Sequence, residues 1–141
     1  MNAIEIDNLS IEGIKEPVIL NYFQSLNAGK FILTANLFAL SGALHPPFES
    51  PIVGEKAIAT YLEKEADGMV LEPRSGTKET LADNNIRFEI AGKVTTTSFK
   101  VNVAWQFILN PDREILHVQV KLLASLQELL KIKPQGKKLL S

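Results

Sequence analysis

The stretch Val101-Asn102-Val103-Ala104-Trp105-Gln106-Phe107-Ile108-Leu109 decides how the chain folds. Apolar side chains alternate along it with polar or small ones, and this period of two is typical of a β-strand with one buried face. Trp105 is the only tryptophan of the chain, and a buried indole N–H needs a hydrogen-bond partner. Two interpretations stay open: a core tryptophan bonded to a backbone carbonyl, or a cavity tryptophan that donates to a ligand. The buried face comprises Val101, Val103, Trp105, Phe107 and Leu109.

The composition describes an ordinary globular chain that is long enough for one domain with a sizeable core. It has 141 residues, of which 45% are hydrophobic and 22% charged, and its net charge is −1. Because positive charges are not in excess, the composition does not suggest binding to nucleic acid. The chain has no cysteine, which excludes disulfides, thiolate catalysis and cysteine-bound metals. Residues 1–10 lack the apolar run of a signal peptide, and no apolar stretch suits a membrane span, so we expect a cytoplasmic protein.

Three segments have the apolar spacing of amphipathic helices. The first begins at Pro17, because proline suits the first position of a helix, and ends at residues 27–29 with the sequence Asn-Ala-Gly. The second is predicted over residues 30–40 and the third over residues 55–66. Between them, a short strand at 43–45 leads into an extended loop with three prolines. The apolar stripe of the first helix consists of Val18, Ile19, Tyr22, Phe23 and Leu26.

From residue 69 onward the pattern is that of strands. They are predicted at residues 69–71, continuing past Pro73 toward residue 80, and at 86–97, 101–109 and 114–122, with a turn at 110–113. Ser-Leu-Gln-Glu at 125–128 is a capping box, which predicts a short helix over residues 126–131. In the last strand the expected inward residues are Leu116, Val118, Val120 and Leu122, and the outward ones are Ile115, His117, Gln119 and Lys121.

The order of these elements predicts an α+β fold, in which three N-terminal helices pack on a curved antiparallel sheet and a short helix follows. A curved sheet wrapped around helices makes a cone, and its open end is a natural place for a ligand. We expect an N-terminal arm at residues 1–13, a single domain at 14–132 and a flexible C-terminal tail at 133–141.

No arrangement of residues in the sequence points to catalysis or to a metal site. There is no glycine-rich phosphate loop, serine elbow, paired carboxylate or metal-ligand spacing. His45 has no acid beside it, and His117 lies on the polar side of its strand, where a structural or solvated role is expected. Glu89 points outward if Phe88 points inward. The strand faces therefore favour binding over turnover, and we predict a protein that is not an enzyme.

Two side chains can serve as polar handles in an apolar binding cavity. Trp105 supplies an N–H donor, and Tyr22 on the first helix supplies a phenol O–H. Two rigid donors that converge on one carbonyl oxygen would polarise a conjugated ketone without reacting with it. The alternative for Tyr22 is a tyrosine at the core edge with its hydroxyl in water.

Several short runs, in the same order and over about residues 11–132, resemble a known family. The chain is similar to the C-terminal-domain-like carotenoid proteins, which are free-standing homologues of the C-terminal domain of the cyanobacterial orange carotenoid protein. The Pro-Pro-Phe loop and the closing Leu-Leu-Ala-Ser are the more specific parts. The matching runs are Leu20-Asn21-Tyr22, Leu26-Asn27-Ala28, residues 42–48 (GALHPPF), 51–54 (PIVG), 102–105 (NVAW), 109–111 (LNP), 122–125 (LLAS) and 128–130 (ELL).

The resemblance implies a nuclear transport factor 2-like fold and a non-covalently held ketocarotenoid such as canthaxanthin or echinenone. It implies that Tyr22 and Trp105 hydrogen-bond the keto oxygen of the pigment's terminal ring. It also implies a homodimer that shares one carotenoid and exchanges it with helical carotenoid proteins or with apo orange carotenoid protein. Because this chain has no cysteine, that dimer would be non-covalent. The expected ligand-binding set is Tyr22, Trp105, Val101, Val103, Phe107 and Leu26.

The leading hypothesis from the sequence is therefore a carotenoid carrier that also quenches singlet oxygen in photoprotection. A transient membrane contact for pigment uptake belongs to the same expectation, and nucleic acid does not. The main alternative is an isomerase or dehydratase of the same fold, which would need an inward Asp or Glu with a raised pKa. A third alternative is a protein-interaction module, which would have a filled core and no cavity.

Overall fold

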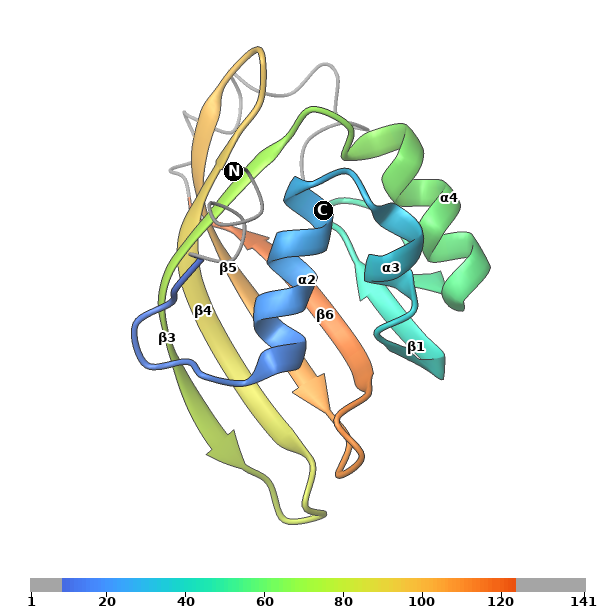
Figure 1. Ribbon diagram of the computed structural model, residues 1–141, viewed down its shortest axis with the longest axis vertical. Coiled ribbons are helices and arrows are strands. Elements are labelled where there is room, and N and C mark those ends of the chain that lie inside the picture. Colours follow the sequence, from blue (N-terminus) through green and yellow to red (C-terminus); the bar gives the residue numbers. More distant parts are fainter. Residues whose placement is uncertain (1–8, 124–141) are drawn as a thin grey trace.

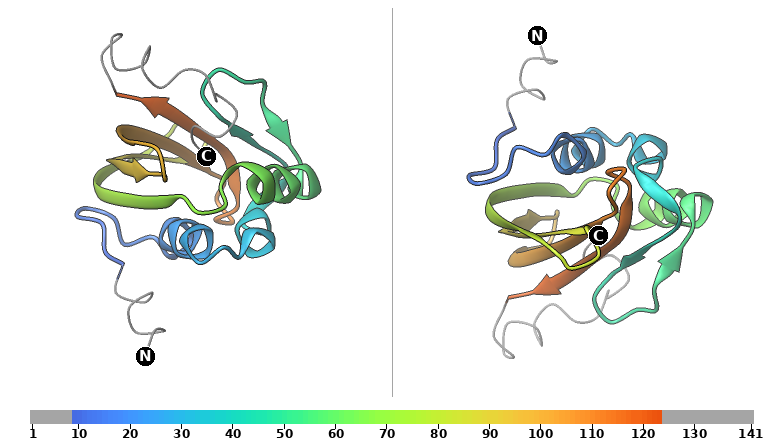
Figure 2. Two further views of the ribbon diagram at one scale, coloured as in Figure 1. Left: turned by 90° about the horizontal axis from the view of Figure 1, so that it is seen from above. Right: turned by 90° about the horizontal axis from the view of Figure 1, so that it is seen from below.

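The computed structural model describes residues 9–123 as three helices on one face of a curved six-stranded sheet (Figure 1). The views from above and below show the curvature of the sheet and the helices along its inner side (Figure 2). The helices are α2 (Pro17–Asn27), α3 (Phe31–Ala35) and α4 (Glu55–Glu65). The strands are β1 (Phe38–His45), β2 (Ile52–Val53), β3 (Val70–Thr80), β4 (Ile86–Thr95), β5 (Lys100–Leu109) and β6 (Ile115–Leu122).

The sheet has the strand order β2-β1-β6-β5-β4-β3. Strands β3 to β6 follow one another as antiparallel neighbours, as the sequence predicts. The expectation of a wholly antiparallel sheet is wrong in one place, because β1 pairs with β6 in parallel. Two strands so far apart in the chain need no tight turn between them, so either direction of pairing is sterically open. The α+β class is confirmed, and the predicted helix at 126–131 lies outside the described residues.

The second helix is much shorter than predicted. It covers only Phe31–Ala35, and residues 38–40 belong to β1 instead. The local spacing of apolar residues is helical there, but Phe38 pairs with Ile115 of β6 and the N–H of Ile115 donates to the carbonyl of Leu37 at 3.0 Å. Pairing with a neighbouring strand thus outweighs a weak local helical preference, since propensity is only a prior that tertiary contacts override.

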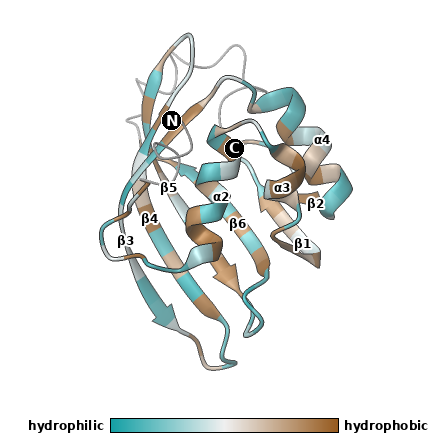
Figure 3. Ribbon diagram, in the orientation of Figure 1, coloured by the Kyte–Doolittle hydropathy of each residue, from teal (hydrophilic) through white to brown (hydrophobic). Residues whose placement is uncertain are grey.

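The strands alternate between the core and solvent, as Figure 3 shows in the banding of hydrophobic and hydrophilic residues along β4, β5 and β6. The alternation predicted for β6 is wrong at its start. Ile115, expected outside, is fully buried, and Leu116, expected inside, is only half-buried. A β-bulge explains the change, because Ile108 pairs with His117 while Leu109 pairs with Ile115, so Leu116 has no partner on β5. Val118 and Val120 then point inward as predicted.

Helix α2 begins where the sequence predicts, at Pro17, and Glu16 caps it by accepting a hydrogen bond from the N–H of Val18 at 3.4 Å. Four of the five residues of the predicted stripe are buried against the inner face of the sheet, and the fifth, Val18, is partly buried. At its end, the amide of Asn27 makes two 2.8 Å hydrogen bonds with the backbone of Leu71, one to its N–H and one to its C=O. The Asn27 side chain thereby pairs with the backbone of Leu71 as a neighbouring strand would, and this pairing holds the end of α2 at the edge strand β3.

The described part of the predicted N-terminal arm covers the same edge of the sheet. The N–H of Glu12 donates to the carbonyl of Arg74 at 2.9 Å, and the N–H of Gly76 donates to the carbonyl of Glu12 at 2.8 Å. Gly13 has a φ of +88°, and a Cβ built there would lie 2.3 Å from the Gly76 oxygen, so this approach requires glycine. The segment therefore protects part of β3 from pairing with another chain.

Candidate functional site

Tyr22 and Trp105 approach the centre of the core from opposite layers, Tyr22 from helix α2 and Trp105 from strand β5. Both residues have 0% of their surface exposed. Neither the Tyr22 hydroxyl nor the Trp105 Nε1 has a hydrogen-bond partner within the described part of the chain. Leaving a buried donor unpaired costs about 1 to 3 kcal/mol, so two of them in one core are an expensive arrangement. Such groups call for a functional explanation.

Two phenylalanine rings join these donors into one aromatic cluster. The Tyr22 ring meets Phe23 at 5.3 Å and Phe107 at 5.0 Å between centroids. Phe23 in turn lies 4.8 Å from Trp105, at an interplanar angle of 80°. These edge-to-face contacts hold the rings in defined orientations. The two donors therefore occupy one rigid, apolar environment, in which a hydrogen bond to a ligand would be strong.

Burial also fixes the protonation of the tyrosine. The cost of placing a phenolate in the core raises the pKa of Tyr22 far above its ordinary value. Its hydroxyl is therefore protonated at any physiological pH and remains a donor. Since the indole N–H of Trp105 is a donor only, the pair matches an acceptor with two lone pairs, such as a ketone oxygen.

The other residues of the predicted ligand-binding set lie on the same inner face. Val101, Val103 and Phe107 are buried on β5, and Leu26 is buried on α2. Phe23 belongs to the cluster as well, although the sequence indicated it only as part of the helix stripe. The sequence could have indicated this role, because Phe23 follows Tyr22 directly and lies on the buried face of an amphipathic helix.

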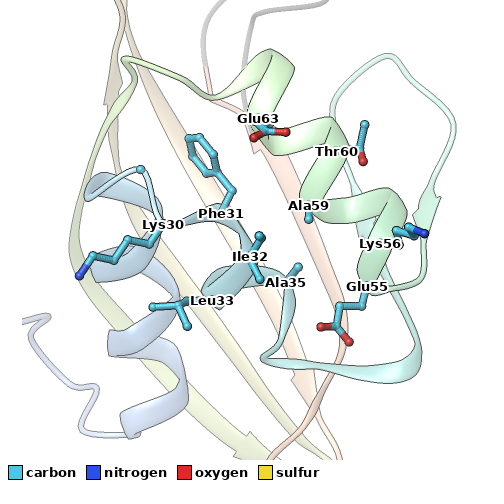
Figure 4. A pocket seen from close by; sticks show the side chains of 11 residues that line it. Lys30, Phe31, Ile32, Leu33, Ala35, Glu55, Lys56, Ala59, Thr60 and Glu63 are labelled. Atoms are coloured by element: carbon cyan, nitrogen blue, oxygen red, sulfur yellow. The ribbon is translucent and has the colours of Figure 1, made fainter.

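The space around the two donors is filled by side chains. A surface exposure of zero leaves no water-sized gap against either residue. Three grooves elsewhere have volumes of about 380 to 670 Å³, and neither Tyr22 nor Trp105 lines them. The groove of about 670 Å³ lies between α3 and α4, and Ile32, Ala35 and Ala59 are among the residues that line it (Figure 4). A ligand can therefore reach the donors only if neighbouring side chains move.

No acidic residue is fully buried in this core within residues 9–123. Apart from Tyr22 and Trp105, Thr34 is the only fully buried residue with a polar side chain in that range. Glu89 is exposed on the outer face, where it accepts a hydrogen bond from Gln106 at 2.8 Å. An isomerase of this fold would need a buried carboxyl with a raised pKa. Within residues 9–123, Glu65 at the end of α4 has one buried carboxylate oxygen without a hydrogen-bond partner, but the residue as a whole is only partly buried.

The two histidines meet on the other side of the sheet. His45 ends β1, His117 lies in β6, and their ring centroids are 4.2 Å apart. The Nδ1 atom of His117 is buried and has no partner among residues 9–123. Burial lowers the pKa of His117, and the nearby His45 and Lys121 lower it further.

The lowered pKa of His117 makes a testable contribution to stability. Because the unfolded chain binds this proton more readily than the folded chain does, the contribution is complete above the ordinary histidine pKa of about 6.5 and is lost as the pH falls below it. We expect the urea concentration at the midpoint of unfolding to decrease as the pH is lowered from about 7.5 to about 5.5. The decrease should be smaller in a His117→Gln variant. An equal fall in both proteins would show that other groups carry the dependence.

No family model matches the chain, but individual relatives do. It is 40% identical over 126 residues to the orange carotenoid-binding protein of Synechocystis sp., and 38% identical over 128 residues to that of Limnospira maxima. These alignments cover 86% and 88% of this chain, which spans only 40% of the length of each relative.

The solved structures agree with the sequence relatives. The orange carotenoid protein of Anabaena (Nostoc) sp., solved with canthaxanthin bound, superimposes with a TM-score of 0.79 at 40% identity. That match covers 87% of this chain and 40% of the other. A nuclear transport factor 2-like protein from Cytophaga hutchinsonii matches with a TM-score of 0.63 at 11% identity, over 86% of this chain and 98% of the other, which shows a shared fold alone.

The chain is therefore a protein of the nuclear transport factor 2-like fold. Over the matched part of their length, it is a homologue of the orange carotenoid-binding proteins, as expected of a C-terminal-domain-like protein. The resemblance predicted from the sequence is thus confirmed. Within residues 9–123, no helix is long and apolar enough to cross a membrane.

Proposed function

We propose that this chain is a carotenoid-binding carrier that holds a ketocarotenoid, such as canthaxanthin or echinenone, without a covalent bond. The observation that carries this proposal is the pair of buried donors without partners, Tyr22 and Trp105. A keto oxygen would satisfy both, and an apolar ring would suit the aromatic cluster around them. The names of the relatives, which are carotenoid-binding proteins, support the same ligand class.

The residues of the core suit the terminal ring of such a pigment and its keto oxygen. The Tyr22 hydroxyl and the Trp105 N–H would each donate to one lone pair of the ring's keto oxygen. Val101, Val103, Phe107 and Leu26, which are buried around them, would pack on the apolar ring. The bound pigment would supply the visible absorption, and the two hydrogen bonds would shift that absorption to the red by drawing electron density toward the oxygen.

Entry of the pigment requires the core to open, because no water-sized space adjoins either donor. Helix α2 carries Tyr22, Phe23 and Leu26 together, so a shift of this helix away from the sheet would move three of the filling side chains at once. We propose that α2 moves when the ring enters. The two hydrogen bonds between Asn27 and Leu71 would keep the C-terminal end of α2 in place while the rest of the helix moves.

The finer parts of the function extend the same proposal. One domain of this size covers only part of a long polyene, so we propose a non-covalent homodimer whose two subunits share one carotenoid. Delivery to helical carotenoid proteins or to apo orange carotenoid protein, quenching of singlet oxygen, transient membrane contact and a cytoplasmic location remain predictions of this proposal.

A protein-interaction module is the second candidate, and the filled core around Trp105 favours it. That candidate gives no reason for two unpaired donors in the core, because a module that only binds through its surface would gain stability by losing them. The pigment carrier explains both features if the core opens on binding. The two candidates therefore differ in whether the purified protein takes up pigment.

The decisive test is a visible absorption spectrum of the protein purified from bacterial cells that make canthaxanthin. We expect a coloured protein whose absorption band lies to the red of free canthaxanthin and which elutes at dimer mass. Cells that make only β-carotene, which lacks the keto oxygen, provide the control and should yield far less pigment. A colourless protein from canthaxanthin-rich cells would reject the carrier and leave the interaction module.

A further inference from the structure

We propose that His45 and His117 form a two-histidine binding site for a divalent transition metal such as Cu²⁺, Ni²⁺ or Zn²⁺. The sequence predicts no metal site, because the two residues are far apart in the chain and no spacing links them. The site would lie on the outer face of the sheet, away from Tyr22 and Trp105, and it does not depend on the carotenoid function.

The parallel pairing of β1 with β6 brings the two imidazoles together. Ala43 is the register partner of His117, and His45 is the partner of Gln119, so the histidines are diagonal neighbours. Paired residues in a sheet point to one face, and Leu44 and Val118, which form the pair between them, are buried on the inner face. His45 and His117 therefore share the outer face, with ring centroids 4.2 Å apart at an interplanar angle of 59°.

The unpaired nitrogen of His117 is the observation that points to a ligand. Its Nδ1 atom is buried and has no hydrogen-bond partner within the described residues. A buried polar atom normally has a partner in the protein, a bound water or an ion. The His45 ring lies beside the His117 ring, and imidazole nitrogens are preferred ligands of Cu²⁺, Ni²⁺ and Zn²⁺.

The surroundings of the two rings decide how a cation could reach them. A metal ion binds an imidazole through the lone pair of its neutral form. Lys121, two strand positions beyond Gln119, is the exposed cation nearby, and its charge acts against a bound cation. His45 is only partly buried, so solvent reaches the pair from its side.

The site would be labile and not a permanent structural centre. Within residues 9–123 there is no group of three or more His, Cys, Asp or Glu side chains that could hold a metal. Two imidazoles would therefore supply two nitrogens, and water would complete the coordination. Structural zinc sites use four protein ligands, so the affinity expected here is far weaker and the metal should exchange.

Copper titration with electron paramagnetic resonance tests this proposal directly. The whole chain contains only two histidines, so any imidazole signal from bound Cu²⁺ must come from His45 or His117. We expect one Cu²⁺ per chain at neutral pH, with pulsed spectra that report two equivalent imidazoles. His45→Gln should leave one imidazole and weaken binding about tenfold or more, because the chelate is lost.

The matched control is Lys121→Gln, which removes the nearby positive charge and keeps both imidazoles. We expect this variant to bind Cu²⁺ at least as tightly as the natural chain does. Thermal unfolding with ZnCl₂ gives a second measurement, in which the natural chain should be stabilised and His45→Gln should not. A spectrum without imidazole, or one with a single imidazole that His45→Gln leaves unchanged, would overturn the proposal.

Discussion

Replacing Tyr22 with phenylalanine is expected to weaken canthaxanthin binding and, at the same time, to make the pigment-free protein more stable. The lost hydrogen bond to the keto oxygen should weaken binding by about 1 to 3 kcal/mol. The same change removes a buried hydroxyl that has no partner in the described structure, and this relief should raise the free energy of unfolding by about 1 kcal/mol. Urea unfolding and pigment titration of the same variant measure both effects.

The matched control is Tyr61→Phe. The Tyr61 hydroxyl donates to Oε2 of Glu49 at 3.2 Å, so its loss should lower stability slightly or leave it unchanged. Trp105→Phe should resemble Tyr22→Phe in its effect on pigment colour and affinity, because it removes the second donor. A Tyr22→Phe protein that is destabilised and binds canthaxanthin normally would show that the hydroxyl has a partner in the core and no role toward pigment.

The largest loss of stability is expected for Phe23→Ala. The Phe23 ring is fully buried and touches Tyr22, Trp105 and Phe107, which makes it the centre of the aromatic cluster. Its truncation removes a large apolar side chain and leaves a cavity, which should lower the free energy of unfolding by about 3 to 5 kcal/mol. The urea unfolding midpoint measures this loss.

Phe48→Ala is the natural comparison, because it makes the same chemical change at a residue that is 74% exposed. We expect its effect to stay within about 0.5 kcal/mol. If Phe23→Ala does not fold, Phe23→Leu supplies a milder test with an intermediate loss. Equal effects at positions 23 and 48 would contradict the central place of Phe23 in the core.

Much of the sheet was predictable because the alternation of apolar and polar residues along a strand shows which of its faces is buried. Every second residue is apolar in β5 and, apart from Gly92, in β4, and both strands form where this alternation predicts them. Proline at the first position likewise marked the start of α2. The signal in each case is local, since one strand face or one helix stripe must be buried whatever else the chain does.

The errors arose where distant parts of the chain decide the local structure. Residues 38–40 have helical spacing but belong to a strand, because Phe38 at its start pairs with Ile115 of β6. The bulge at Leu116 exchanges the inner and outer residues at the start of β6, and a single inserted residue leaves no mark in the hydrophobic pattern. The nearness of His45 to His117 depends on the same parallel pairing, so no reading of spacing along the chain would find it.

The burial of the two candidate donors was predictable from the sequence, whereas the packing around them was not. The sequence placed Tyr22 and Trp105 on inward faces, and the structure buries both. It did not indicate that the core around them would be filled, because packing density depends on how side chains from separate elements interlock.

The parallel pairing of β1 with β6 also bears on how quickly and in what order the chain folds. Strands β3 to β6 are joined by short connections, so their hairpins close small loops, whereas joining position 43 to position 117 closes a very long one. We expect strands β3 to β6 to pair early. The pairing of β1 with β6, and the packing of the helices that precede β1, should form late. The two aromatic donors would then meet only in the last step, so a newly made chain would become able to accept pigment only once it is completely folded.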